Sequence, residues 1–330
     1  MNTSLPTGDR FAVVTGTTQQ TVWDYSPCFT ARPGAHGAER MNMSAREALS
    51  FSEIPDVQSQ IDYRNLRIDD VGVKGVRYPL TINSGGKPMP TIATLALTVG
   101  LSASDKGTHM SRFLELLELQ ADALDPAGYR GMVFNMLDRL GAQTGAIDMC
   151  FPYFVQKTAP VSGVKSLLDC DVRWRGAVSE AGRYAFSMQV MVPATSLCPC
   201  SKEISTYGAH NQRSHITIEA GLEGVMAIEE LIAIAEGSAS CEVYGLLKRP
   251  DEKYVTERAY DNPKFVEDLV RDVAVALDRD PRVGAYVVEA ENFESIHNHS
   301  AFARIVQPGS APGKRQTEPL VHRSPAGEKA

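Results

Sequence analysis

Apolar and polar residues alternate along several stretches of the chain, and alternation with a period of two predicts β-strands. Residues 66–82, LRIDDVGVKGVRYPLTI, alternate in this way, and the apolar segment 91–103, TIATLALTVGLSA, follows the turn-forming letters NSGGKP. These two segments predict a β-hairpin. A further pair of strands is predicted at residues 149–163 and 165–178.

Between these two pairs the spacing of apolar residues becomes helical. In residues 108–125 the apolar positions fall on one side of a helix, at Phe113, Leu114, Leu117 and Leu124. Thr108 or Ser111 is available as the N-cap of this helix. A second helix is predicted at about residues 128–141.

The second half of the chain repeats this plan, although no repeat is visible letter by letter. Strands are predicted at residues 183–195, 215–222, 283–295 and 300–306, and helices at 225–236 and 263–279. Asn262 can cap the last helix and Pro263 fits its first position. The pattern predicts an α+β fold of two tandem ββααββ units, with antiparallel sheets and the helices on one face.

These units divide the chain into a first unit at residues 53–180 and a second unit at 181–306. Residues 1–52 are rich in Thr, Gly, Pro, Ser and Ala and have no sustained apolar period, so we expect a flexible N-terminal extension. Residues 307–330 have the same character and are expected to form a flexible C-terminal tail. We therefore expect the chemistry to lie between the two ends.

Composition narrows the class of protein. The 330 residues are 43% hydrophobic and 22% charged, which is typical of a globular protein with ample material for a core. The net charge of −7 gives no bulk attraction for nucleic acid or for an anionic membrane, so neither partner is expected. No stretch approaches the roughly 18 apolar residues of a membrane span, and the first residues lack a signal-peptide pattern. We expect a cytoplasmic protein.

The segment CPCSKEIS, residues 198–205, places two cysteines one proline apart. A disulfide between Cys198 and Cys200 would be strained, because relaxed disulfides hold their Cα atoms about 5.5 Å apart. A structural zinc site usually needs a second cysteine pair, which this chain lacks. Two interpretations of Cys198 stay open, namely an open metal site shared with His210 or an ordinary buried thiol. Cys200 has Lys202 nearby and is either a reactive thiol or filler.

Other polar clusters could bind ligands or could simply be solvated. The loop YGAHNQRSH packs donors densely, including Arg213. A helix start in DKGTHMSRF carries three basic or imidazole side chains that could bind phosphate, Lys106, His109 and Arg112. An ordinary capped helix start explains the same letters equally well.

Acidic and imidazole side chains also gather near the C-terminal end. The segment ENFESIHNHSAF holds Glu294 with His297 and His299, two histidines that share one face of an extended chain. The segment KRPDEKYVTE places Asp251 and Glu252 on a predicted loop, where carboxylates are usually solvated. Taken alone, Glu267 is a surface residue beside the apolar stripe of the last helix.

Together these motifs resemble one family. The segments VGVKGVRYPL, KGTHMSRF, CPCSKEISTYGAHNQRSH, KRPDEKYVTE, NPKFVEDLVRD and ENFESIHNHSAFA, within about residues 53–306, are similar to GTP cyclohydrolase I of type IB, which opens folate biosynthesis. The resemblance implies the tunnelling fold, in which ββααββ units assemble into barrels. It also implies a homotetramer with active sites between subunits, which agrees with the duplicated pattern.

The resemblance implies a reaction and a set of residues. GTP and water would give 7,8-dihydroneopterin triphosphate and formate after a metal-activated water attacks guanine C8. The divalent metal, Mn2+, Fe2+ or Zn2+, would be held by Cys198, His210, Glu252 and His297. Cys198, Cys200 and His297 would be catalytic, with Cys200 moving protons. Glu267 would bind the purine, and the triphosphate candidates are Lys106, His109, Arg112, Lys202 and Arg213.

Other functions remain open at this point. A related tunnelling-fold enzyme could form a pterin with a cyclic phosphate, or reduce a nitrile with a cysteine and NADPH. The nitrile reductase is disfavoured because metal-type His and Glu positions are present. A non-catalytic metal or nucleotide binder is the alternative from another class.

Overall fold

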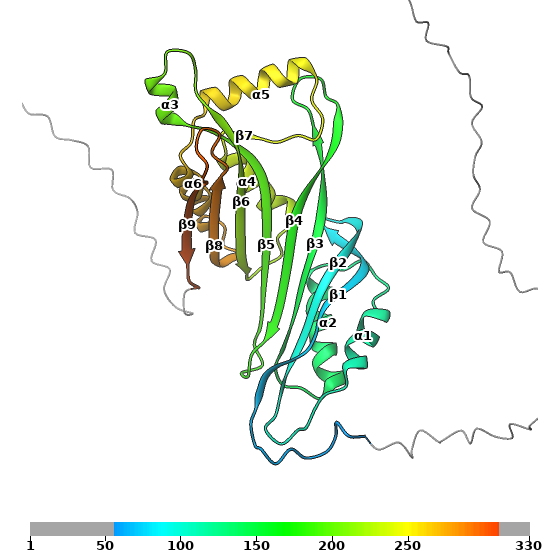
Figure 1. Ribbon diagram of the computed structural model, residues 1–330. Coiled ribbons are helices and arrows are strands. Elements are labelled where there is room, and N and C mark those ends of the chain that lie inside the picture. The colour runs from blue at the N-terminus through cyan, green and yellow to red at the C-terminus, as the bar shows by residue number, and fades with distance from the viewer. Residues whose placement is uncertain (1–55, 310–330) are drawn as a thin grey trace, which may run out of the picture. The chain divides into compact units, whose positions relative to one another are not determined.

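One antiparallel sheet runs through residues 56–309, the part of the chain that the computed structural model describes (Figure 1). Its strand order is β1-β2-β3-β4-β5-β6-β8-β9, and the short β7 pairs with β5. The strands are β1 Ile68–Ser84, β2 Lys87–Leu101, β3 Gly145–Thr158, β4 Lys165–Val178, β5 Tyr184–Leu197, β6 Asn211–Leu222, β7 Cys241–Glu242, β8 Val283–Asn292 and β9 Ala301–Gln307. Because only β7 departs from the path, neighbours in sequence are nearly always neighbours in the sheet.

Two helices pack on the first half of the sheet. They are α1 Met110–Glu118 and α2 Pro126–Leu140. The start of α2 is set by Asp125, whose Oδ1 accepts a hydrogen bond from the Gly128 amide at 2.7 Å, with Pro126 in the first turn. Gly141 ends it with a left-handed φ of 63°, a conformation that favours glycine.

Four helices belong to the second half. They are α3 Pro199–Ile204, α4 Ile228–Ser238, α5 Arg249–Asp261 and α6 Val266–Asp278. Helix α4 packs on β5 and β6, while α6 packs on β8 and β9. The buried side of α6 is apolar, with Leu269, Val273 and Leu277 fully covered. This packing leaves the first turn of α6 at the end of the sheet where β5 ends and β6 begins.

The core lies between the sheet and the helices and continues from one half to the other. Tyr129 and Trp174 are fully buried at its centre, with their rings edge to face at 5.6 Å. The Tyr129 hydroxyl donates to the Ile147 carbonyl at 2.8 Å, and burial raises the pKa of this phenol well above its ordinary value. The buried Nε1 of Trp174, in contrast, has no hydrogen-bond partner among residues 56–309.

The predicted α+β fold with two ββααββ units is confirmed. Strands β1 to β4 enclose α1 and α2 in sequence, and β5, β6, β8 and β9 enclose α4 and α6. The two halves form one continuous sheet, because β4 pairs with β5. The sheet therefore has no break that would mark a domain boundary, and the boundary between residues 180 and 181 stays a prediction. Residues 1–52 and 310–330 of the predicted extension and tail lie outside the described residues. In residues 56–309, no helix is both long and apolar enough to cross a membrane.

The helix predicted at residues 108–125 is shorter than expected. It ends at Glu118, and Leu124 instead adds to the edge of the sheet, donating from its amide to the Thr81 carbonyl at 2.7 Å. Leu114 is exposed, while Leu116 takes the buried position. The spacing of apolar residues correctly predicts that Leu124 is buried. It is wrong in placing Leu124 on a helix, because this residue pairs with β1.

Three further predictions differ in the second half. The segment KRPDEKYVTE, residues 248–257, predicted as a loop, instead lies largely in α5, whose only buried side chains are Asp251 and Ala259. The last helix begins at Val266, since Asn262 ends α5 and Phe265 receives a reciprocal cap from Asp268. Part of the predicted cysteine loop is the short helix α3.

Candidate functional site

The pairing of β5 with β6 brings Cys198 and His210 together. The register places Leu197, the last residue of β5, opposite Asn211, the first residue of β6, so Cys198 and His210 come next to each other just beyond the strand ends. The Cys198 amide donates to the His210 carbonyl at 3.1 Å. Cys198 and His210, which are twelve residues apart in sequence, are thus held together by a backbone hydrogen bond.

Helix α3 fixes the thiol of Cys198. This residue is the N-cap, and its Sγ accepts a hydrogen bond from the Ser201 amide at 3.4 Å. The Ser201 hydroxyl in turn accepts from the His210 amide at 3.1 Å, which ties the helix start to β6. Cys200 is exposed on the same helix. The proline between the cysteines therefore separates a held thiol from a free one.

The ring of His210 is oriented by acceptors around Nδ1. The Gln212 Oε1 lies at 2.8 Å, the Ser295 hydroxyl at 3.4 Å and a Glu294 carboxylate oxygen at 3.9 Å. Within residues 56–309, Nε2 has no hydrogen-bond partner. A neutral imidazole that donates from Nδ1 carries its lone pair on Nε2, which is then available to a metal.

A cavity of about 280 Å³ opens beside this pair, lined from α3, the start of α6 and the β8–β9 connection. Its lining residues are Cys198, Pro199, His210, Gln212, Lys264, Phe265, Val266, Glu267, Asn292, Glu294, His297, His299 and Ala301. His297 and His299 stack with ring centroids 5.1 Å apart. One cavity therefore collects a thiol, imidazoles and carboxylates from segments far apart in sequence.

Glu267 reaches this cavity from the first turn of α6. Its carboxylate has no hydrogen bond or ion pair to any other described residue. Lys264 lines the same wall, with its Nζ 2.5 Å from Asp272 and its amide bound to the Leu197 carbonyl at 3.0 Å. The unengaged carboxylate can accept hydrogen bonds from a ligand.

Glu252 does not line the cavity. It lies on α5, its side chain is 51% exposed, and it pairs with Arg249 at 2.9 Å. No group of three His, Cys, Asp or Glu side chains in residues 56–309 is arranged to hold a metal ion. Cys198, His210 and His297 line one cavity, and the role of these three residues and of Glu252 as metal ligands stays a prediction.

Its neighbour Asp251 is the buried carboxylate of this segment. It accepts from the amides of Val161, Ser162 and Lys248, each at 2.8 Å, and from the Ser162 hydroxyl at 2.6 Å. Burial alone would raise the pKa of Asp251, but these hydrogen bonds hold it well below its ordinary value. Asp251 therefore clamps the start of α5, and with it Glu252, to the β3–β4 turn.

The three phosphate candidates of the first unit lie elsewhere, at the connection from β2 to α1. Lys106 donates to Gln60 at 2.8 Å, His109 contacts Asp56 at 3.2 Å, and an Arg112 guanidinium donates to a backbone carbonyl at 3.1 Å. None of them lines the cavity of Cys198.

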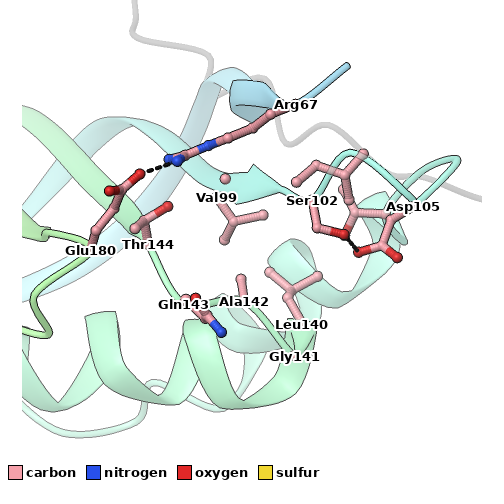
Figure 2. Close-up of a pocket in the computed structure, with 13 residues that line it drawn as sticks. Arg67, Val99, Ser102, Asp105, Leu140, Gly141, Ala142, Gln143, Thr144 and Glu180 are labelled. Atoms are coloured by element: carbon pink, nitrogen blue, oxygen red, sulfur yellow. Dashed lines mark hydrogen bonds and ion pairs between the residues drawn. The ribbon is translucent and has the colours of Figure 1, made fainter. Parts of the chain in front are cut away.

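A separate cavity of about 560 Å³ adjoins this connection. Figure 2 shows Ser102 hydrogen-bonded to Asp105 on one side and Arg67 paired with Glu180 on the other. Thr108 also lines it. The cavity is thus a polar one in the first unit, next to the three phosphate candidates.

Lys202 and Arg213 are also outside the Cys198 cavity. Lys202 donates to the Tyr260 carbonyl at 2.5 Å and lies over the ring of that tyrosine. Arg213 follows Gln212 on β6 and so points to the opposite face, where it lines a cavity of about 170 Å³ with Glu242. Burial would raise the pKa of Glu242, but the Tyr244 hydroxyl and the nearby Arg258 hold it below its ordinary value.

Sequence reasoning missed Lys264. The signal was present in NPKFVEDLVRD, where a lysine precedes the first turn that carries Glu267. Gln212 was noticed only as one donor in a dense loop. Its role as the Nδ1 partner follows from strand alternation, which puts residues two apart on one face.

Comparison with known proteins adds an independent result. A family model described as type I GTP cyclohydrolase folE2 matches residues 54–303. A GTP cyclohydrolase FolE2 of Paraburkholderia xenovorans is 62% identical over 253 residues, 76% of this chain and 94% of that protein. One from Neisseria meningitidis serogroup C is 54% identical over 282 residues, 86% of this chain and 94% of that protein. A solved uricase from Arthrobacter globiformis superimposes with a TM-score of 0.44 and 8% identity, over 76% of this chain and 96% of that one. Because the family model covers residues 54–303, which include nearly all of both ββααββ units and the whole cavity beside Cys198, this chain belongs to the type I GTP cyclohydrolase family.

Proposed function

We propose that this protein is a GTP cyclohydrolase that converts GTP and water into 7,8-dihydroneopterin triphosphate and formate. The observation that carries the proposal is the single cavity that joins the Cys198 and His210 pair to the free carboxylate of Glu267. The family and the relatives at 54–62% identity support the reaction.

The donor set fits a divalent metal. Cys198 and His210 are fixed next to each other by backbone hydrogen bonds, and thiolate with imidazole is a ligand pair for Zn2+ and its neighbours. We propose Zn2+, Fe2+ or Mn2+, held by these two residues with Glu252 and His297. When bound, the metal would supply an activated water for attack at guanine C8.

Glu267 is the proposed purine anchor. Its carboxylate can accept two parallel hydrogen bonds, from guanine N1–H and from the 2-amino group. Because those atoms lie on the far side of the purine from C8, anchoring them at α6 directs C8 towards Cys198 and His210. Glu267 would therefore bind and orient the base.

Cys200 and His297 are the proposed proton carriers. Cys200 is exposed at the second position of α3, two residues after the N-cap Cys198, and His297 lines the cavity itself. Thiol and imidazole groups both titrate near neutral pH in favourable surroundings, as proton transfer requires.

The triphosphate would be bound between subunits. We propose that Lys106, His109 and Arg112 contact it from a neighbouring chain of a homotetramer, and that Lys202 and Arg213 belong to the chain that holds the metal. In residues 56–309, strand β9 pairs on one side only, and the outer edge of β1 is bonded to Leu124 only at Thr81 and Asn83, which leaves two edges for a second copy. The cytoplasmic location stays a prediction.

The test is incubation of the full chain with GTP and Mn2+ or Zn2+. We expect release of formate and, after oxidation, a fluorescent pterin that retains the triphosphate. A cyclic phosphate product would indicate the related pterin-forming enzyme. Metal and GTP binding without turnover by any divalent ion would indicate a non-catalytic binder and contradict the proposal.

A further inference from the structure

Gln212 is a nearly buried amide in contact with a proposed metal ligand. It is 7% exposed, and its Oε1 lies 2.8 Å from the Nδ1 of His210. His210 directly precedes β6 and lies two positions before Gln212, so the two side chains are on the same face of the extended chain. A buried amide is expensive unless it is hydrogen-bonded, so this contact needs a role.

A group of buried polar side chains lies next to Gln212. Directly beneath it on the same side of the sheet, the buried Ser214 hydroxyl contacts Ser196 at 2.8 Å and Asn292 at 2.7 Å. Asn292 also lines the cavity. Gln212 is opposite Ser196 in the β5–β6 register, so its amide lies at one end of a buried polar group that spans β5, β6 and β8.

The atoms around His210 Nδ1 are all acceptors or can act as acceptors. Besides the Gln212 amide oxygen they are the Ser295 hydroxyl at 3.4 Å and the Glu294 carboxylate at 3.9 Å. Such surroundings favour the tautomer with its proton on Nδ1. The amide oxygen is the nearest of the three and adds no charge.

We propose that Gln212 is a positioning residue that fixes the Nδ1–H tautomer and the ring orientation of His210, so that Nε2 is presented to the metal. This inference rests on the proposed function, in which His210 is a ligand. Outer partners of metal-ligating histidines contribute about 10- to 100-fold to metal affinity. Glu294 is farther from Nδ1 and acts on the ring only through its charge.

The test compares metal affinity in the full-length protein. Gln212→Leu keeps the bulk of the side chain and removes the acceptor, while Gln212→Glu restores an acceptor. Asn211→Leu makes the same amide-to-leucine change on the exposed, opposite face of β6. The probe is Zn2+ in competition with a chromophoric chelator, and unfolding of the metal-free proteins checks the fold.

We expect Gln212→Leu to bind Zn2+ roughly 10- to 100-fold more weakly, and Gln212→Glu and Asn211→Leu to stay within about threefold of the wild type. With Co2+ as probe, Gln212→Leu should retain the thiolate charge-transfer band of Cys198 and alter the ligand-field bands. If Gln212 only stabilised the fold, its replacement would change the charge-transfer band and the ligand-field bands together.

Failure of this inference differs from failure of the proposed function. If His210→Ala keeps its Zn2+ affinity, the metal assignment itself is wrong. If His210→Ala loses Zn2+ while Gln212→Leu binds like the wild type, the positioning role is overturned. Should Gln212→Leu not fold, a Gln212→Glu variant that folds but binds Zn2+ more than tenfold weaker would overturn it equally.

Discussion

Replacement of Glu267 by Gln removes one negative charge from the wall of the cavity and leaves the shape of the side chain almost unchanged. The amide keeps one acceptor oxygen but turns an NH2 group towards a second donor of the guanine edge. One charge-assisted hydrogen bond is lost and one donor faces another donor. The variant therefore isolates the proposed purine contact.

The size of the effect follows from the exposure of the site. A hydrogen bond to a charged group contributes about 1.5–3 kcal/mol. We count one such bond, because the amide of the variant keeps the other acceptor oxygen and because Glu267 is exposed in the free chain and loses no internal contact. This corresponds to a loss of roughly 10- to 150-fold in kcat/KM. Loss of a carboxylate from the first turn of α6 should change stability by only about 0.3–1 kcal/mol.

The assay is steady-state formation of the pterin with the metal-loaded enzyme, together with chelator competition for Zn2+. Asp268→Asn is the matched control, because it removes the same charge from the same helical turn. Asp268 caps the Phe265 amide and does not line the cavity. We expect the control to lose some stability and to keep its kcat/KM.

Two results would refute this reasoning. A kcat/KM for Glu267→Gln within threefold of the wild type would show that the carboxylate does not anchor the purine. A large loss of Zn2+ affinity in the same variant would place Glu267 in the metal site instead.

Three further predictions concern the metal, the clamp at α5 and assembly. Cys198→Ala and His210→Ala should each lose bound metal and activity together, as measured by metal content after gel filtration; either variant with full metal content would remove that residue from the ligand set. Because its hydrogen bonds lower the pKa of Asp251, its stabilisation is present above the ordinary pKa of 3.8 and is lost as pH falls towards the lower folded value. Asp251→Asn should therefore lower the melting temperature at pH 7 and flatten its fall on acidification, and an unchanged acid profile would contradict this role. Phe302→Lys places a charge on the edge strand β9, where the side chain is 58% exposed, and should shift light-scattering mass towards smaller species; an unchanged mass would separate this edge from the interface.

Much of the fold could be predicted from sequence because long amphipathic strands carry a strong period-two signal. The burial pattern of β2 alternates along its second half, as the letters TIATLALTVGL indicate. Helix α5 could not be found in this way, because it buries only two side chains and one of them is Asp251. Its apolar stripe is missing, and what secures its first turn is a carboxylate bound to a distant β-turn.

The sequence by itself determined the inventory of the site: the paired cysteines, the histidines, the acidic residues and the family they resemble. Tertiary structure decided which of them meet. The β5–β6 register places Cys198 against His210, and packing of α6 on β8 and β9 brings in Glu267, a residue that looks like an ordinary surface glutamate. The same structure leaves Glu252 outside this cavity, together with the three phosphate candidates Lys106, His109 and Arg112. The physical reason is that residue type and spacing fix local chemistry, whereas the approach of segments distant in sequence depends on strand pairing and core packing.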